Sequence, residues 1–277
     1  MLAALLALGA SASWGCGDFL GGVKSRTLHP LAILAVSQPV GLAFLGVIVA
    51  VRATAPPGAS VAWAAPAAIV GTIGLAAFYR GMAVGAISIV APIAGAGAAI
   101  PVLVGVLRGD RPSVLQGVGF AAAIVGVVLS SWERRPDGGT RWATGAGYGL
   151  VSMVAFGTYF VFLHQASSDD FLWPAFLFRV VSTSVVWIAL LALRTSMRGV
   201  GGTMAVLVLI GLLDTGGNTF YAAAASYGSL SVTAVLASLY PVVTVLLARY
   251  RLHERVHRLQ EVGIVLTIAG IVLVSAG

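Results

Sequence analysis

The chain contains one pattern of polar and glycine residues twice, once toward the end of each half. The first copy reads Asp110-Arg111, Gln116, Gly119, Gly126, Leu129 and Ser131, and the second reads Glu254-Arg255, Gln260, Gly263, Gly270, Leu273 and Ser275. Every position of the second copy lies 144 residues after its counterpart. Shorter pairs repeat at displacements of 140 to 143, namely Gly85-x-x-Ser88 with Gly228-x-x-Ser231, Phe78-Tyr79 with Phe220-Tyr221, and Pro101-Val102 with Pro241-Val242. A chain whose halves repeat one another is predicted to form two units of the same fold.

The composition places both units in a membrane. Hydrophobic residues make up 59% of the 277 positions and charged residues 9%, whereas about a quarter of the residues of a soluble domain are charged. The net charge of +7 comes from basic residues scattered between apolar runs, which provide no surface for nucleic acid. A lone cysteine, Cys16, excludes an internal disulfide. The four histidines lack the spacing of metal ligands, so we expect neither a metal nor a cofactor.

Ten apolar segments approach the roughly 20 residues that a helix needs to cross a bilayer. They cover residues 2–22, 31–51, 62–84, 88–107, 113–131, 143–163, 171–193, 203–224, 230–248 and 259–276. The first segment has no positively charged start and runs past the apolar length of a signal peptide, so we count it as a span. The sequence therefore predicts an all-α polytopic membrane protein with ten transmembrane helices.

The longest polar stretch between spans, residues 132–142, is the predicted linker between the halves. It separates a first repeat, residues 1–132, from a second, residues 143–277. Each repeat has five spans, and after an odd number of crossings the second copy must enter the membrane from the other side, so the repeats are predicted to be inverted. Connections after odd-numbered spans carry eleven basic residues and the others three. The positive-inside rule therefore places both termini outside.

Several short motifs together resemble one known family. They are Trp14-Gly15, Asp18-Phe19 and Gly21-Gly22 in the first span, the spans with Pro101 and Pro241, and the acid-Arg-x(4)-Gln-x-x-Gly ends of both halves. On these residues the chain resembles a transporter of the drug/metabolite superfamily with two EamA-type repeats, over nearly its whole length. The resemblance implies a ten-helix bundle that carries small metabolites, amino acids, sugars or drugs across the cytoplasmic membrane, often as an exporter. Members are generally drawn with their termini inside, which disagrees with the charge distribution.

The resemblance also implies an arginine in the second span of each repeat. Arg179 matches it in the second half, but the first half reads Ser37-Gln38-Pro39 there and has no basic residue. The two halves are therefore not expected to bind a solute equivalently.

Four charged residues lie at least four residues inside predicted spans, and a charge at mid-membrane costs roughly 2.5–3.5 kcal/mol. They are Asp18, Arg80, Arg179 and Asp214. At a rise of about 1.5 Å per residue, Arg179 and Asp214 lie at similar depths from one face and are predicted to pair. Asp18 and Arg80 lie nearer the opposite face, where we expect them to pair and to tie two spans together or to act in gating.

A polar stripe and a set of aromatic residues complete the predicted cavity. Asp214, Asn218 and Tyr221 share one face of their span, because they follow helical spacing. Trp14, Tyr79, Tyr159 and Tyr240 lie inside spans, and buried tyrosine hydroxyls need partners. Solute contact and interhelical packing both remain open for these residues. Pro101 and Pro241 are predicted to kink their helices, either permanently or as part of a gate.

These residues favour a secondary transporter that works by alternating access in a bacterial cytoplasmic membrane. Its partners are a small solute and the bilayer, and a homodimer remains open. Arg179 is expected to attract an anionic group of the solute, and Asp214 to carry any proton coupling. A lipid-carrier flippase is the first alternative. The second, an intramembrane aspartyl protease, rests on Gly15-Cys16-Gly17-Asp18 with Asp214, but the motif order and the predicted depths oppose it, so we expect no enzyme.

Overall fold

The computed structural model describes residues 1–53, 55, 58, 62–109, 111–134, 140–166, 170, 172–227 and 236–276. Three residues of the repeated patterns, Asp110, Gly228 and Ser231, lie outside the described residues. The start of the predicted ninth span also lies outside them.

Long apolar helices make up almost all of the described chain. They are α1 (Leu2–Ser25), α2 (Pro30–Arg52), α3 (Ala64–Val84), α4 (Ile87–Gly95), α5 (Ala99–Leu107), α6 (Val114–Ser131), α7 (Ala146–Ala166), α8 (Leu172–Ala192), α9 (Met204–Tyr227), α11 (Tyr240–Leu252) and α12 (Arg258–Ala276). Short 3₁₀ turns precede α5 and α9, at Ala96–Ala98 (η2) and Gly201–Thr203 (η3). Within the described residues, nine helical segments are long and apolar enough to cross a membrane, counting α4 to α5 as one.

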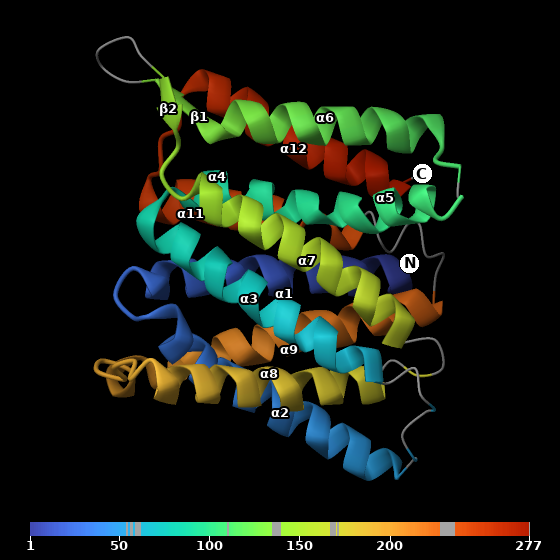
Figure 1. Ribbon diagram of the computed structural model, residues 1–277, viewed down its shortest axis with the longest axis vertical. Coiled ribbons are helices and arrows are strands. Elements are labelled where there is room, and N and C mark those ends of the chain that lie inside the picture. Colours follow the sequence, from blue (N-terminus) through green and yellow to red (C-terminus); the bar gives the residue numbers. More distant parts are fainter. Residues whose placement is uncertain are drawn as a thin grey trace.

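The two halves pack against each other helix by helix. The most extensive contacts between them join α1 with α9, α3 with α7, α2 with α8, and α6 with α12. The first two pairs are equivalent, because each joins the first helix of one repeat to the third helix of the other. In Figure 1, α1 runs from right to left and α7 from left to right, so the second repeat is inverted. The predicted all-α polytopic membrane fold in two repeats is confirmed.

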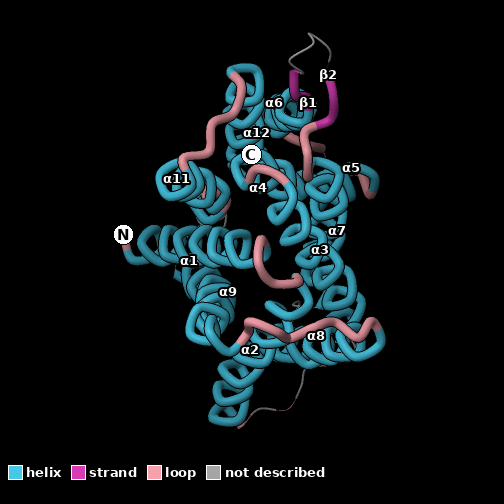
Figure 2. Tube along the Cα trace, turned by 90° about the vertical axis from the view of Figure 1, so that its left-hand side faces the viewer, coloured by secondary structure: helices cyan, strands magenta, loops and turns pink. Residues whose placement is uncertain are grey.

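The connections fall on two opposite faces. Both termini lie on the right in Figure 1, and we call this side the terminal face. The connections α1–α2, α3–α4, α6–α7, α8–α9 and α11–α12, which carry most of the basic residues, lie on the left and form the basic face. Seen from the basic face, α1, α9 and α11 lie to one side and α3 and α7 to the other, with α2 and α8 below (Figure 2).

The linker between the halves contains a small hairpin that the polar composition did not predict. Strand β1 (Trp132–Arg134) pairs antiparallel with β2 (Thr140–Trp142), and Trp132 lies opposite Trp142. The centroids of these two rings are 5.8 Å apart. A cross-strand aromatic pair of this kind stabilises a short ladder, so the hairpin fixes the chain on the basic face between α6 and α7.

The repeated glycines lie where α6 and α12 meet, at the top of Figure 1. A Cβ atom at Gly126 would collide with the backbone nitrogen of Thr267, and a Cβ atom at Gly263 would collide with that of Ser130. Gly119 and Gly270 approach each other's backbone in the same way. Small residues allow helix backbones to come this close in a membrane. The strongest repeat in the sequence therefore builds a close helix–helix interface.

Each of the two predicted kink prolines follows a break in its span. Pro101 lies in the first turn of α5, directly after η2. Pro241 lies in the first turn of α11, after a turn at residues 238–239. Proline is tolerated in a first helical turn, where its missing N–H would have no partner inside the helix. Pro101 thus starts the second helix of a broken span, and Pro241 lies at the start of α11, so neither proline bends the middle of a described helix.

Candidate functional site: the cavity between the halves

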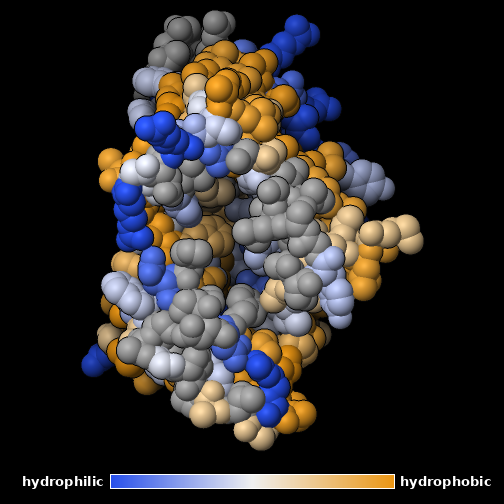
Figure 3. Space-filling model, turned by 90° about the vertical axis from the view of Figure 1, so that its right-hand side faces the viewer, coloured by the Kyte–Doolittle hydropathy of each residue, from blue (hydrophilic) through white to orange (hydrophobic). Residues whose placement is uncertain are grey.

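A cavity of about 130 Å³ lies between the two repeats. Its lining comes from seven helices and consists of Trp14, Asp18, Gln38, Gly71, Thr72, Leu75, Phe156, Tyr159, Phe160, Phe178, Arg179, Asp214, Asn218 and Tyr240. Figure 3 shows the terminal face hollowed near its centre, which is where a cavity between these helices would open. Most of the lining surface is apolar, and its charged groups lie in two places.

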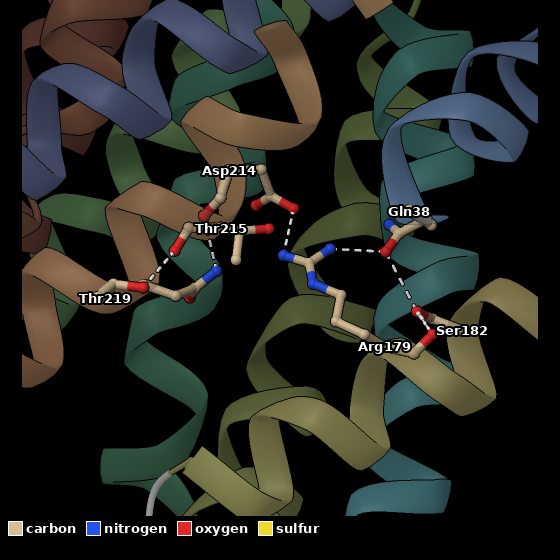
Figure 4. Close-up of polar contacts among 7 residues, drawn as sticks. Gln38, Arg179, Ser182, Asp214, Thr215 and Thr219 are labelled. Carbon is tan, nitrogen blue, oxygen red and sulfur yellow. Dashed lines mark hydrogen bonds and ion pairs between the residues drawn. The ribbon is translucent and has the colours of Figure 1, made fainter. Parts of the chain in front are cut away.

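The first polar place is a buried ion pair. Arg179 on α8 donates from Nη2 to Oδ2 of Asp214 on α9 at 2.6 Å. Its other terminal nitrogen, Nη1, donates to Oε1 of Gln38 on α2, also at 2.6 Å, and Ser182 donates to the same oxygen at 3.1 Å (Figure 4). The structure thus contains the pair that the depths of Arg179 and Asp214 predicted. Because the Arg179 side chain is only 4% exposed, the guanidinium needs both partners to remain charged there.

A glycine makes room for this arginine. A Cβ atom at Gly41 on α2 would lie 3.0 Å from Nε of Arg179 and would collide with the hydroxyl of Thr215. Absence of a side chain at Gly41 therefore lets Arg179 pass close beneath α2 to reach Asp214. This role could not be predicted from the residue order, because Gly41 belongs to an otherwise apolar span.

The second polar place is Asp18 on α1. Its carboxylate lines the cavity, and within the described residues it has no hydrogen-bond or ion-pair partner. The predicted pair with Arg80 is absent, because Arg80 lies on an exposed face of α3. Depth along a helix does not specify which way a residue faces, and this is why the prediction was wrong. Asp18 and Asp214 were also predicted to lie at different depths and so to be kept apart, but both line this one cavity.

The predicted aromatic and stripe residues divide into two groups. Trp14, Tyr159, Tyr240 and Asn218 line the cavity, and the Asn218 amide donates to the carbonyl of Asp214 at 2.8 Å. Tyr221 is not among the lining residues, but its ring lies 5.9 Å from that of Trp14.

Tyr79 was predicted to line the cavity and does not. It is 2% exposed, packs tightly against Gly21 and forms part of the apolar core.

Sequence reasoning did not propose several of the lining residues. These are Gln38, Gly71, Thr72, Leu75, Phe160 and Phe178. Residues of these types are common inside spans and give no signal by themselves. Gln38 alone could have been found, because it occupies the region of the first repeat that corresponds to Arg179. The described residues of the chain form no cluster of three or more His, Cys, Asp or Glu that could hold a metal ion.

The two long walls of the cavity differ in chemistry. At a displacement of 142, which also relates Phe78-Tyr79 to Phe220-Tyr221, Trp14 corresponds to Phe156, Asp18 to Phe160 and Asp214 to Thr72. We call the α1–α9 side the acidic wall and the α3–α7 side the apolar wall. The hydroxyl of Thr72 is buried without a hydrogen-bond partner in the described part of the chain. The repeat-related walls are thus alike in backbone and different in charge.

The basic face is held together by a carboxylate from the second half. Glu254, in the α11–α12 connection, accepts hydrogen bonds from the backbone nitrogens of Ile87 and Ser88 at 3.1 and 2.9 Å and from the Ser88 hydroxyl at 2.9 Å. It also pairs with Arg26, which follows α1, at 2.7 Å. We call these contacts the Glu254 latch. The N-terminus of α4 suits an anion, and the latch therefore ties the second repeat to two elements of the first.

Comparisons with known proteins agree with the fold. The model of the EamA-like transporter family matches residues 1–132 and 143–276. A solved structure titled only as a crystal structure of a protein superposes with a TM-score of 0.66 at 15% identity, over 98% of this chain and 95% of that one. At this identity the likeness shows the fold alone. No curated protein matches the chain.

Proposed function

Because the chain belongs to the EamA-like transporter family, we propose that it carries a small solute across the membrane by alternating access, with the solute bound in the cavity. The observation that carries the proposal is the cavity itself, which is built from both repeats around the buried Arg179–Asp214 pair. Inverted repeats that enclose a site at mid-membrane suit a rocking motion of one bundle against the other. The family is generally non-enzymatic, and we propose no catalytic role.

The Glu254 latch supports the direction of the proposed motion. The hollow lies on the terminal face, whereas the latch holds the two repeats together on the basic face. Opening toward the basic face requires Glu254 to leave Ser88 and Arg26, and hydrogen bonds to a charged group are worth about 1.5–3 kcal/mol each. Water and the newly exposed surfaces would offset part of this cost, so two states within a few kcal/mol of each other are reasonable.

The buried Arg179–Asp214 pair offers a way to couple solute binding to the uptake of a proton. In the arrangement described, both terminal nitrogens of Arg179 are occupied, by Asp214 and Gln38. Protonation of Asp214 would release one of them, and Arg179 could then hold an anionic group of the solute. We therefore assign proton coupling to Asp214 and the attraction of an anionic group to Arg179. Asp18, in the same cavity, is a second group able to take up a proton.

The remaining features of the proposal follow from charge and family. The positive-inside rule places the basic face in the cytoplasm, so the hollow on the terminal face would open to the outside. We propose export of small metabolites, amino acids among them, across a bacterial cytoplasmic membrane. A lipid carrier would be favoured by a side portal lined with basic residues. In the described lining, Arg179 is the single basic residue and is already paired.

A thermal-unfolding screen of the purified protein tests the proposal. A solute present at a hundred times its dissociation constant stabilises the folded state by about 2.7 kcal/mol. We expect one class of small solute to raise the unfolding temperature, Asn218→Ala to abolish the shift, and the same solute to exchange across proteoliposome membranes. Arg52→Gln is the control, since Arg52 pairs with Asp170 away from the cavity. Proteoliposomes that move no small solute but scramble labelled lipid would replace the proposal with the lipid-carrier reading.

A further inference from the structure

The charges of the cavity do not balance. Its described lining contains two carboxylates, Asp18 and Asp214, and one guanidinium, Arg179. Arg179 and Asp214 neutralise each other through their 2.6 Å contact. Asp18 is left without a partner among the described residues. A carboxylate held away from bulk water is costly unless a cation accompanies it, so the cavity is suited to accept one positive charge.

The surroundings of Asp18 indicate which kind of cation fits. Trp14 lies one helical turn before Asp18 and so on the same side of α1, and both line the cavity. The ring of Tyr240 meets that of Trp14 edge-on at 6.2 Å, and the ring of Tyr221 lies at 5.9 Å. Aromatic faces attract organic ammonium groups. Metal cations such as Ca²⁺ instead need six to eight oxygen ligands, which this aromatic cluster does not offer.

The opposite side of the cavity shows what the rest of the solute must be. The apolar wall presents Leu75, Phe156 and Phe160, and Phe160 occupies the position that corresponds to Asp18 of the acidic wall. A solute that spans the cavity therefore meets a carboxylate and aromatic rings at one end and hydrocarbon at the other. The unpaired hydroxyl of Thr72 offers one further hydrogen bond on the apolar wall.

A carboxylate on the solute is not required in this arrangement. Arg179 already donates to Asp214 and to Gln38, and its Nε lies close against α2 at Gly41. The guanidinium has no free terminal nitrogen to offer an anion until Asp214 releases it. Among the described lining residues, the carboxyl group without a partner is that of Asp18.

We infer that the transported solute is a small amphipathic amine, whose protonated nitrogen is held by Asp18 and the rings of Trp14 and Tyr240 while its apolar body lies against the α3–α7 wall. This inference rests on the proposed transport function and narrows its substrate class. It makes Asp18 the residue that determines selectivity for a cation, and it makes a free carboxylate on the solute dispensable.

Three probes of similar size and different charge test the inference. They are 2-phenylethylamine, 2-phenylethanol and 3-phenylpropionate, titrated at pH 7 into the purified protein with the shift in unfolding temperature as the readout. We expect the amine to bind at least tenfold more tightly than the alcohol or the carboxylate. Asp18→Asn should weaken amine binding about tenfold and leave alcohol binding unchanged, which removes the preference. Asp170→Asn makes the same chemical change outside the cavity and should leave it intact.

Some results would overturn the inference. A wild-type protein that binds none of the probes, or that binds the alcohol as well as the amine, contradicts it without any variant. So does an amine preference that persists in Asp18→Asn. The fate of the transport proposal is read separately in proteoliposomes. If amine binding depends on Asp18 but the amine does not exchange across the membrane, the amine site is supported and the transport proposal is contradicted. If a solute exchanges and its exchange does not depend on Asp18, the transport proposal is supported and the amine site is contradicted.

Discussion

The α6–α12 interface keeps the same residues in both copies of the repeat, whereas the two walls of the cavity have different residues at corresponding positions. At the interface, Gly126 and Gly270 occupy equivalent positions of the two copies, and a Cβ atom at either would collide with a backbone nitrogen of the other helix, that of Thr267 or Ala123. In the cavity, Asp18 corresponds to Phe160, and Asp214 to Thr72. A two-fold interface between repeats places the same steric demand on both copies, so the same residue is needed twice. A small solute has no such symmetry, and its site gains from two different walls.

The largest effect is expected from Gly126→Ala, which tests whether the α6–α12 interface requires glycine. The added Cβ would meet the backbone nitrogen of Thr267, which cannot move aside as a side chain tip could. Overpacking typically costs about 1–3 kcal/mol, and we expect a value at or above the upper end. The loss is measured as a drop in unfolding temperature in detergent. Gly117→Ala is the matched control, because a Cβ there meets nothing within 4 Å. Equal stability of the two variants would contradict the proposed close contact.

The role of the cavity is tested by removing one partner of the buried Arg179–Asp214 ion pair. Asp214→Asn leaves Arg179 buried without its counterion. Breaking a fully buried pair costs about 3–5 kcal/mol, and because Asp214 is 35% exposed we expect about 2 kcal/mol. The double variant Arg179→Gln with Asp214→Asn should recover much of this stability but transport no solute. If the double variant is as unstable as the sum of the single ones, the two residues do not act as a pair.

The Glu254 latch tests whether a residue of the repeated pattern also acts outside the α6–α12 interface. Glu254 belongs to that pattern, but its hydrogen bonds lie outside the interface. Glu254→Ala removes an acceptor for Ile87, Ser88 and Arg26. We expect a loss of about 1–2 kcal/mol and greater labelling of residues beneath the basic face by water-soluble reagents. Glu261→Ala, which breaks an exposed pair with Arg249, serves as the control. Unchanged labelling after Glu254→Ala would mean that the latch does not seal this face.

The smallest effect is expected far from both regions. Arg52 and Asp170 form a pair at 3.0 Å in which the arginine side chain is 40% exposed. Exposed pairs contribute about 0.2–1 kcal/mol, so Arg52→Gln should scarcely change the unfolding temperature or solute binding. A loss comparable to that of Asp214→Asn would show that stability is not concentrated in the buried pair and the glycine interface.

Different parts of the site were predictable to different degrees. Depth along the spans was enough to pair Arg179 with Asp214, because both lie deep and few other charges are available. The same argument failed for Asp18 and Arg80, because it ignored rotation about the helix axis, and Arg80 faces outward. Tyr79 was predicted as a cavity wall and instead packs on Gly21 in the core. The repeat of Tyr79 as Tyr221 therefore did not indicate which residues line the cavity.

Hydrophobic length, the duplication and the odd number of spans determined that this chain would form inverted repeats in a membrane, because each of these is a property of residue order alone. The tertiary structure decided which side chains share the cavity. Gln38 joins Arg179 from a helix 141 residues away, and Glu254 reaches the start of α4 from the other repeat. Such contacts depend on how each helix is rotated and how closely it approaches its neighbours. Those quantities are set by packing among all the helices, and no single span contains them.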